Sequence, residues 1–384
     1  MNKAVNNPSQ ATRRILLCVT GLSPQVVTET LYALALQHDF MPHEIHLITT
    51  QNGAERARLT LLSDEPGWLG RLLHEYDLPA VASTQIHVLQ GAAAHALNDI
   101  RTLSDNEAAA NQITEIVRQL TVDPASAVHA SIAGGRKTMG FYLGYAMSLF
   151  GRSQDRLSHV LVSSPFESNQ NFYYPSQSTR IIYTPTPDQQ PLDTKDAVVT
   201  LADIPFVRMR DGLNDVIRNG EASFSGAVAQ AQRALGPAEL VLDAATRNIS
   251  CGGVNLTLAP VDFAFYAWFA RRAQQQQEGF CRNDISAEET AEFLAGYPKA
   301  DDLSGGYERV ANAVGEAMTT DYFDQRRSRV NRVLVSALGK VAAAPYRIIG
   351  SGKRPRTHYR IELPPERVRF DEIPGSKQES PCNA

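Results

Sequence analysis

Two short loops in the first half of the 384-residue chain combine residue types that suit phosphate binding. One reads Thr-Gly-Leu-Ser-Pro-Gln over residues 20–25, and the other reads Ala-Gly-Gly-Arg-Lys-Thr over residues 133–138. Each follows a predicted strand and opens a predicted helix, where unpaired N–H groups and the positive end of the helix dipole favour an anion. The glycines of the second loop allow the backbone to approach a ligand closely, and its arginine and lysine add positive charge.

Neither loop matches a common nucleotide-binding motif. The first lacks GxGxxG, which disfavours a dinucleotide redox cofactor. The second is not a P-loop, because Ser131 stands where GxxxxGK[ST] requires its first glycine, and Arg136 directly precedes the lysine. Taken alone, a Ser-Pro helix start is usually only a cap, and a Gly-Gly-Arg-Lys turn is often only a solvated tight bend. Two such loops at the same sheet edge favour a binding site.

Alternating strands and helices are predicted to bring both loops to one edge of a sheet. Apolar runs predict buried strands over residues 15–20, 44–50, 85–89, 127–132 and 157–162. Helices are predicted over residues 24–36 with Ser23 as N-cap, from about residue 54, and over residues 106–120 and 137–150. This alternation is typical of a Rossmann-like α/β fold with a parallel sheet, in which ligands bind at the carboxyl edge. We expect this domain to cover residues 1–200, with a connecting region over residues 201–237.

The second half, residues 238–384, predicts a winged helix-turn-helix domain. A hairpin is predicted from residues 239–243 and 253–258, followed by helices over 261–272, 287–294 and 325–338 and by strands over 346–349 and 358–363. Basic residues on the last helix and on the loop between the last strands suit phosphate contact; they are Arg326, Arg329, Lys353, Arg354 and Arg356. DNA or RNA binding, dimerisation and closure over the ligand pocket all remain open for this domain.

Composition and charge exclude several classes of protein. The hydrophobic share of 43% and charged share of 20% are typical of a globular chain, and its length favours two domains. The net charge of -4 excludes a uniformly basic nucleic-acid coat. No apolar run approaches the roughly 20 residues of a membrane helix, and the polar start of the chain is unlike a secretion signal. The four scattered cysteines predict neither a zinc site nor a disulfide framework, so we expect a reduced cytoplasmic protein without metal or cofactor.

The stretches ILLCVTGLSPQVVTETLYAL and SIAGGRKTMGFYLGYAMSLFG together resemble the CRISPR-associated Rossmann fold (CARF) proteins. Within them, the chain is most similar to the ring nuclease group related to the Csm-type accessory ribonucleases. The resemblance covers about the first half of the chain. It implies a homodimer that binds cyclic oligoadenylate across its two-fold axis, and cuts the ring without metal to switch off type III CRISPR signalling.

The resemblance also assigns roles to the loop residues. Cleavage by the neighbouring ribose 2′-OH requires in-line placement and stabilisation of added negative charge. Lys137 would stabilise the scissile phosphate and Ser23 would position the ribose or phosphate, as the two catalytic residues. The ligand cradle would consist of Gly21, Leu22, Gln25, Gly134, Gly135, Arg136 and Thr138. The expected product is linear di-adenylate ending in a 2′,3′-cyclic phosphate, from a cyclic tetra-adenylate ring whose size is a family expectation.

Two other functions remain open from the sequence. The ring could be the effector of a DNA-binding transcription regulator, or the protein could be a sensor that binds the ring without cutting it. The accessory ribonucleases carry a second nuclease domain marked by Arg, four to six residues, then His. The only histidine after His159 is His358, and residues 351–353 are Ser, Gly and Lys. We therefore expect no ribonuclease domain of that kind.

Overall fold

The computed structural model describes residues 8–38, 40–91, 94–167, 169–210, 213, 215–220, 223–234, 236–297, 306–352 and 357–371. The chain divides into two compact units, Met1–Arg210 and Asp211–Ala384. The first unit continues past residue 200, where we expected the domain to end. The reason is that β8 (Val199–Asp203) pairs with the sheet as an additional edge strand.

A six-stranded sheet in the order β3-β2-β1-β4-β5-β8 forms the centre of the first unit. Its first five strands are β1 (Arg13–Val19), β2 (Glu44–Thr49), β3 (Ser83–Val88), β4 (Ser126–Ser131) and β5 (Arg156–Val162). These five pair in parallel, whereas β8 runs antiparallel to β5. Every residue of β4 is buried, as expected of a strand covered on both faces. The Rossmann-like α/β fold predicted from the sequence is confirmed.

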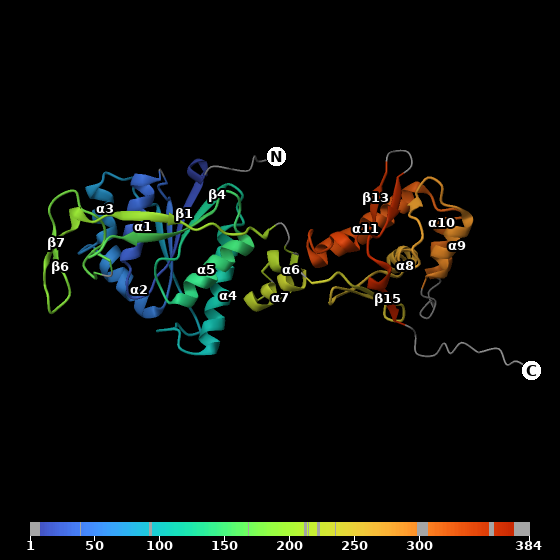
Figure 1. Cartoon of the computed structure of the whole chain (residues 1–384), viewed down its shortest axis with the longest axis horizontal. Coiled ribbons are helices and arrows are strands. Elements are labelled where there is room, and N and C mark those ends of the chain that lie inside the picture. Colours follow the sequence, from blue (N-terminus) through green and yellow to red (C-terminus); the bar gives the residue numbers. More distant parts are fainter. Residues whose placement is uncertain are drawn as a thin grey trace, which may run out of the picture. The chain divides into compact units, whose positions relative to one another are not determined.

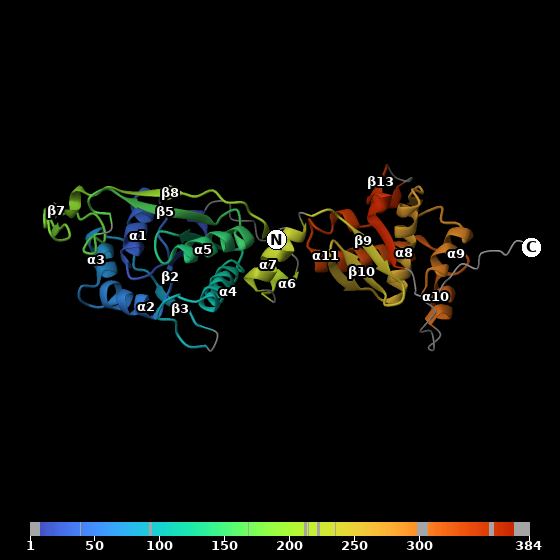
Figure 2. The same cartoon turned by 60° about the horizontal axis from the view of Figure 1, so that its bottom comes forward.

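Helices cover both faces of this sheet (Figures 1 and 2). On one face lie α1 (Gln25–Gln37), α2 (Gln51–Ala57) with the π-helical turn η2 (Arg58–Leu62), and α3 (Trp68–Glu75). On the other face lie α4 (Leu103–Leu120) and α5 (Lys137–Phe150), which pack against each other. α1 packs on β5 and β8. The predicted helices over 24–36, 106–120 and 137–150 are thus confirmed, whereas α3 was not predicted.

The segment after β5 is anchored by aromatic side chains. Phe172, Tyr173 and Tyr174 are all buried, and the ring of Tyr173 stacks on Trp68 of α3 with the centroids 4.7 Å apart. A short hairpin of β6 (Ile181–Tyr183) and β7 (Pro191–Asp193) follows. This packing fixes the chain that passes the carboxyl end of β5.

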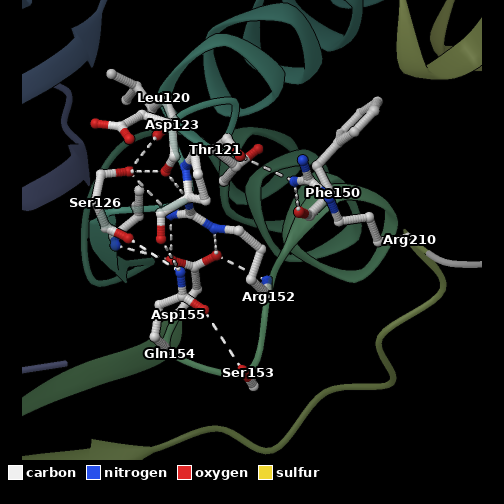
Figure 3. Close-up of polar contacts among 12 residues, drawn as sticks. Leu120, Thr121, Asp123, Ser126, Phe150, Arg152, Ser153, Gln154, Asp155 and Arg210 are labelled. Carbon is white, nitrogen blue, oxygen red and sulfur yellow. Dashed lines mark hydrogen bonds and ion pairs between the residues drawn. The ribbon is translucent and has the colours of Figure 1, made fainter. Parts of the chain in front are cut away.

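A network of polar contacts lies at the amino edge of the sheet, opposite the carboxyl edge where ligands are expected (Figure 3). Asp155, which is fully buried, accepts hydrogen bonds from the guanidinium of Arg152 to both carboxylate oxygens at 2.8 Å. It also accepts from the backbone N–H of Val128 at 2.9 Å. Arg210 donates to the carbonyl oxygens of Thr121 and Phe150, at 3.0 and 2.7 Å. The last residue of the first unit is therefore tied to the carboxyl ends of α4 and α5.

The second unit contains a four-stranded sheet in the order β11-β10-β9-β15. It is built from β9 (Leu240–Asp243), β10 (Asn248–Cys251), β11 (Val254–Thr257) and β15 (Val368–Asp371). The predicted hairpin of residues 239–243 with 253–258 is wrong, because β10 lies between these strands and pairs with both. Gly252 and Gly253, with φ of 55° and 80°, form the tight two-residue turn that connects β10 to β11.

The remaining elements follow in the order helix, strand, three helices, two strands. They are α8 (Pro260–Gln274), β12 (Phe280–Cys281), α9 (Ala287–Ala295), α10 (Gly306–Val314), α11 (Thr320–Leu338), β13 (Ile349–Ser351) and β14 (His358–Arg360). The three strands form an antiparallel sheet in the order β12-β14-β13. The short helices α6 (Asp215–Arg218) and α7 (Phe224–Ala234) precede this unit's sheets. None of the helices in the described ranges has the length and hydropathy needed to cross a bilayer.

Candidate functional site at the carboxyl edge of the sheet

The two loops singled out in the sequence lie against each other at the carboxyl edge. A Cβ added to Gly21 would lie 3.5 Å from the Cα of Gly135, so the backbones are in direct contact. A Cβ on Gly134 would lie 2.7 Å from the carbonyl oxygen of Val19, closer than real Cβ atoms approach. Gly135 has a φ of +76°, in the left-handed region that favours glycine. Local geometry therefore requires glycine at both positions of the second loop.

The starts of α1 and α5 thus meet at this edge, and the two cations at the start of α5 differ in whether they have an ion-pair partner. Arg136, the N-cap residue of α5, forms an ion pair with Asp99 in which Nε lies 2.9 Å from Oδ1. This hydrogen bond holds the pKa of the Asp99 carboxyl at about 2. Lys137 and Thr138 are exposed, and Lys137 has no hydrogen-bond or ion-pair partner within the described ranges. Lys137 is therefore the cation at this helix start that remains available to a ligand.

The first loop differs from its prediction in one respect. Pro24, with φ of -71° and ψ of -9°, occupies the N-cap position of α1, which has no side-chain cap, so the prediction that Ser23 is the cap is wrong. Ser23 is exposed and its hydroxyl bonds to no described residue. Leu22 is 68% exposed. Gln25 is buried and its Nε2 donates to the carbonyl oxygen of Gln170 at 2.8 Å, while its Oε1 has no partner in the described part of the chain.

Two hollows flank the point where the loops meet. The first, of about 390 Å³, lies on the β2 and β3 side and is lined by residues that include Thr20, Gly21, Leu22, Asp99, Gly135 and Arg136. The second, of about 320 Å³, lies between α1 and β5 and is lined by residues that include Ser23, Gln25, Glu29, Ala133, His159 and Gln170. The site residues predicted from the first loop are therefore divided between the two hollows.

Sequence reasoning missed Asp99 and Glu29. Glu29 lies one turn after Gln25 on α1, and burial raises the pKa of its carboxyl to about 8. The sequence did contain one indication of Glu29, because it is the only charged residue from Ile15 to Gln37. Asp99 comes from the long connection after β3 and had no local signal. Across the described residues there is no group of three or more His, Cys, Asp or Glu placed to hold a metal ion.

The basic residues predicted in the second unit have different surroundings. Arg326 of α11 is only 12% exposed, and its guanidinium pairs with Asp262 of α8 at 2.9 Å. The prediction that Arg326 contacts nucleic acid or ligand is therefore not supported, because this side chain holds two helices together. Arg329 is exposed. The remaining predicted contacts, Lys353, Arg354 and Arg356, lie outside the described residues.

A groove of about 720 Å³ runs between α11 and β13 in the same unit. Arg327, Arg332 and Arg347 contribute to its lining. The Nε of Arg347 is buried without a hydrogen-bond partner among the described residues. Three arginines therefore line the groove, and one of them, Arg327, pairs with Asp324 at 3.2 Å.

Together, the fold and the site define a Rossmann-like α/β protein with two glycine loops in contact at the carboxyl edge of its sheet. A model of the family described as CRISPR-associated protein NE0113 matches residues 23–237, which is more than half of the chain. The chain belongs to this CRISPR-associated family. The comparison with curated proteins yields no match.

Several solved structures share limited similarity with the chain. Enterococcus italicus Csm6 bound to cyclic hexa-2′-fluoro-hexa-dAMP is 11% identical, with 91% of this chain and 74% of that chain covered and a TM-score of 0.28. Can2 from Sulfobacillus thermosulfidooxidans in complex with cyclic tetra-adenylate is 9% identical, with 84% and 66% covered and a TM-score of 0.22. A putative UDP-N-acetylglucosamine 2-epimerase from Listeria monocytogenes is 15% identical, with 38% and 31% covered and a TM-score of 0.21. The chain thus spans about a third of the epimerase, and at these TM-scores none of the three indicates its function.

Proposed function

We propose that the first unit is a CARF domain that binds cyclic oligoadenylate across a homodimer and cleaves it without metal. The observation that carries the proposal is the contact between the two glycine loops, which places the exposed Ser23 and Lys137 at one sheet edge. Membership of a CRISPR-associated family supports a ligand from CRISPR signalling. The sequence resemblance to ring nucleases supports the reaction.

In the proposed reaction, a ribose 2′-OH attacks the adjacent phosphorus, and the 5′-oxygen of the next nucleotide leaves. The products carry a 2′,3′-cyclic phosphate and a 5′-hydroxyl. The ammonium of Lys137 and the N–H groups at the start of α5 stabilise the negative charge that builds on the phosphate oxygens. Ser23 orients the ribose or the phosphate for in-line attack. The ion pair of Arg136 with Asp99 keeps the second loop in place.

A homodimer would present two copies of these loops to one ring. Two cuts in a cyclic tetra-adenylate then give two linear di-adenylates. The decisive experiment incubates the full chain with cyclic tetra-adenylate and cyclic hexa-adenylate in excess EDTA and resolves the products by chromatography. Di-adenylate ending in a cyclic phosphate supports the proposal. Ring that stays intact but bound indicates a sensor, and the absence of both binding and cleavage would overturn the proposal.

A second function, DNA binding, is favoured by the groove in the second unit. We propose that the elements from α8 to β14 form a winged helix, in which α11 is the recognition helix. The observation that favours nucleic acid is the position of Arg327, Arg332 and Arg347 along the groove beside α11. Retention of the protein on duplex DNA that falls steeply with salt is the expected result. A lack of salt-dependent retention would remove the regulator function.

A further inference from the structure

The hollow between α1 and β5 contains the carboxyl group of Glu29, which has no described hydrogen-bond or ion-pair partner and no role in the proposed cleavage. Glu29 is half-buried on α1, and its carboxyl forms no hydrogen bond or ion pair with any described residue. The other titratable side chains that line the hollow are His159 of β5 and Glu167 of the segment after it. No cation from these elements is therefore paired with Glu29.

Burial determines the protonation state of this carboxyl. It raises the pKa of Glu29 to about 8, so that the neutral acid predominates at pH 7. A neutral carboxyl presents one O–H donor and one carbonyl acceptor side by side. The Watson–Crick edge of adenine presents the complementary pair, because N1 accepts a hydrogen bond and the N6 amino group donates one.

The remainder of the hollow also fits a base attached to a ribose phosphate. Its volume of about 320 Å³ is at the lower end of the range for small-molecule sites. Gln25 is 5% exposed, and its Oε1 lacks a donor within the described residues, so an amino group on a ligand would satisfy it. Ser23 lines the same hollow and belongs to the loop that contacts Gly135. A base in the hollow would thus leave its sugar and phosphate near Ser23.

We propose that this hollow is an adenine pocket and that Glu29 is its specificity-determining residue, donating as a neutral acid to adenine N1 and accepting from N6. The inference rests on the proposed function, since it assigns a base of the same cyclic ligand to a place beside the loops. The pocket would select bases with an acceptor at N1. It would also couple ring binding to the protonation of Glu29.

Equilibrium binding of the tetra- or hexa-adenylate ring at pH 7 and pH 9 tests the pocket, with the wild type, Glu29→Gln, Glu29→Ala and the control Glu107→Gln. Glutamine keeps a donor and an acceptor at all pH values, so Glu29→Gln should bind equally at both. The wild type should bind about tenfold more weakly at pH 9 than at pH 7 for each occupied pocket. Glu29→Ala should bind at least about tenfold more weakly at pH 7. Glu107→Gln, which is exposed on α4 and lies outside the hollow, should follow the wild type.

A ring in which each adenine N1 is replaced by C–H provides a matched ligand. The wild type should lose affinity for this ring, whereas Glu29→Ala should bind both rings alike. Binding by the wild type that is indifferent to Glu29 and to N1 would overturn the adenine pocket while the proposed function stands. If the wild type binds neither natural ring at either pH, the proposed function itself fails.

Discussion

The two edges of the central sheet differ in whether their buried polar atoms have hydrogen-bond partners. At the amino edge, the buried carboxylate of Asp155 has partners on both oxygens (Figure 3). At the carboxyl edge, the hydroxyls of Thr20 and Thr49 and the Oε1 of Gln25 are buried without partners in the described residues. Because buried polar groups are normally paired, the first edge contributes to stability, whereas the second contains polar atoms whose hydrogen bonds the proposed ligand would complete. Substitutions at the two edges should therefore have separate consequences.

The largest effect is expected for Lys137→Ala. If the ammonium stabilises the transition state, ring cleavage should fall about 100- to 1000-fold, with the melting temperature unchanged because the side chain is exposed. Ser23→Ala should reduce cleavage much less. Single-turnover cleavage in EDTA measures both, with Lys195→Ala as the control for an exposed lysine elsewhere in the unit. Equal rates for wild type and Lys137→Ala would refute the catalytic assignment.

The opposite response is expected at the amino edge for Asp155→Ala. Its removal leaves the guanidinium of Arg152, which is 10% exposed, without its buried partner. The free energy of unfolding should fall by about 3 kcal/mol. Chemical denaturation of the full chain measures this, and Asp188→Ala, on an exposed turn, provides the control. An unchanged stability would contradict the division of roles between the edges.

A smaller effect with a defined pH dependence is expected for the stability of Glu29→Gln. The folded pKa of about 8 lies above the unfolded value near ~4.3, so the wild type loses stability as pH rises between the two values. At pH 9 the variant should be more stable than the wild type by about 1–3 kcal/mol, allowing for solvent in the hollow. Near pH 4 the two should coincide. If the difference in stability between the two proteins stays constant across this pH range, the carboxyl of Glu29 does not have the raised pKa.

The smallest effect is expected in the second unit. Arg329→Ala should weaken duplex retention by a few-fold and lower the salt slope by about 1, uniformly across sequences, if this exposed arginine contacts phosphate. Arg326→Ala should instead lower stability, because it leaves Asp262 without its partner. Salt-dependent retention and thermal melting of both variants separate the two roles. A loss of retention for Arg326→Ala with unchanged melting would reverse the assignments.

The elements of the first unit were accessible from the sequence because their signals are local. The apolar runs of β1, β2, β4 and β5 and the loop glycines at 134 and 135 each reflect the immediate surroundings of a few consecutive residues. The meeting of the two loops also followed, since parallel strands deliver their carboxyl ends to one edge. In the second unit, β10 was missed because Asn248 and Gly252 were both assigned to one turn. Asn248 in fact begins β10, and Gly252 lies in the turn that follows this strand.

The amino-acid sequence by itself determined the Rossmann-like sheet and the place of the glycine loops. Only the tertiary structure decided which polar groups are engaged there. Asp99 reaches Arg136 from the connection after β3, and Glu29 of α1 shares a hollow with His159 of β5. These partners are far apart along the chain, and no periodicity or spacing encodes such pairings. The pKa of Glu29 and the availability of Lys137 depend on burial and on neighbours, and both arise only when the chain has packed.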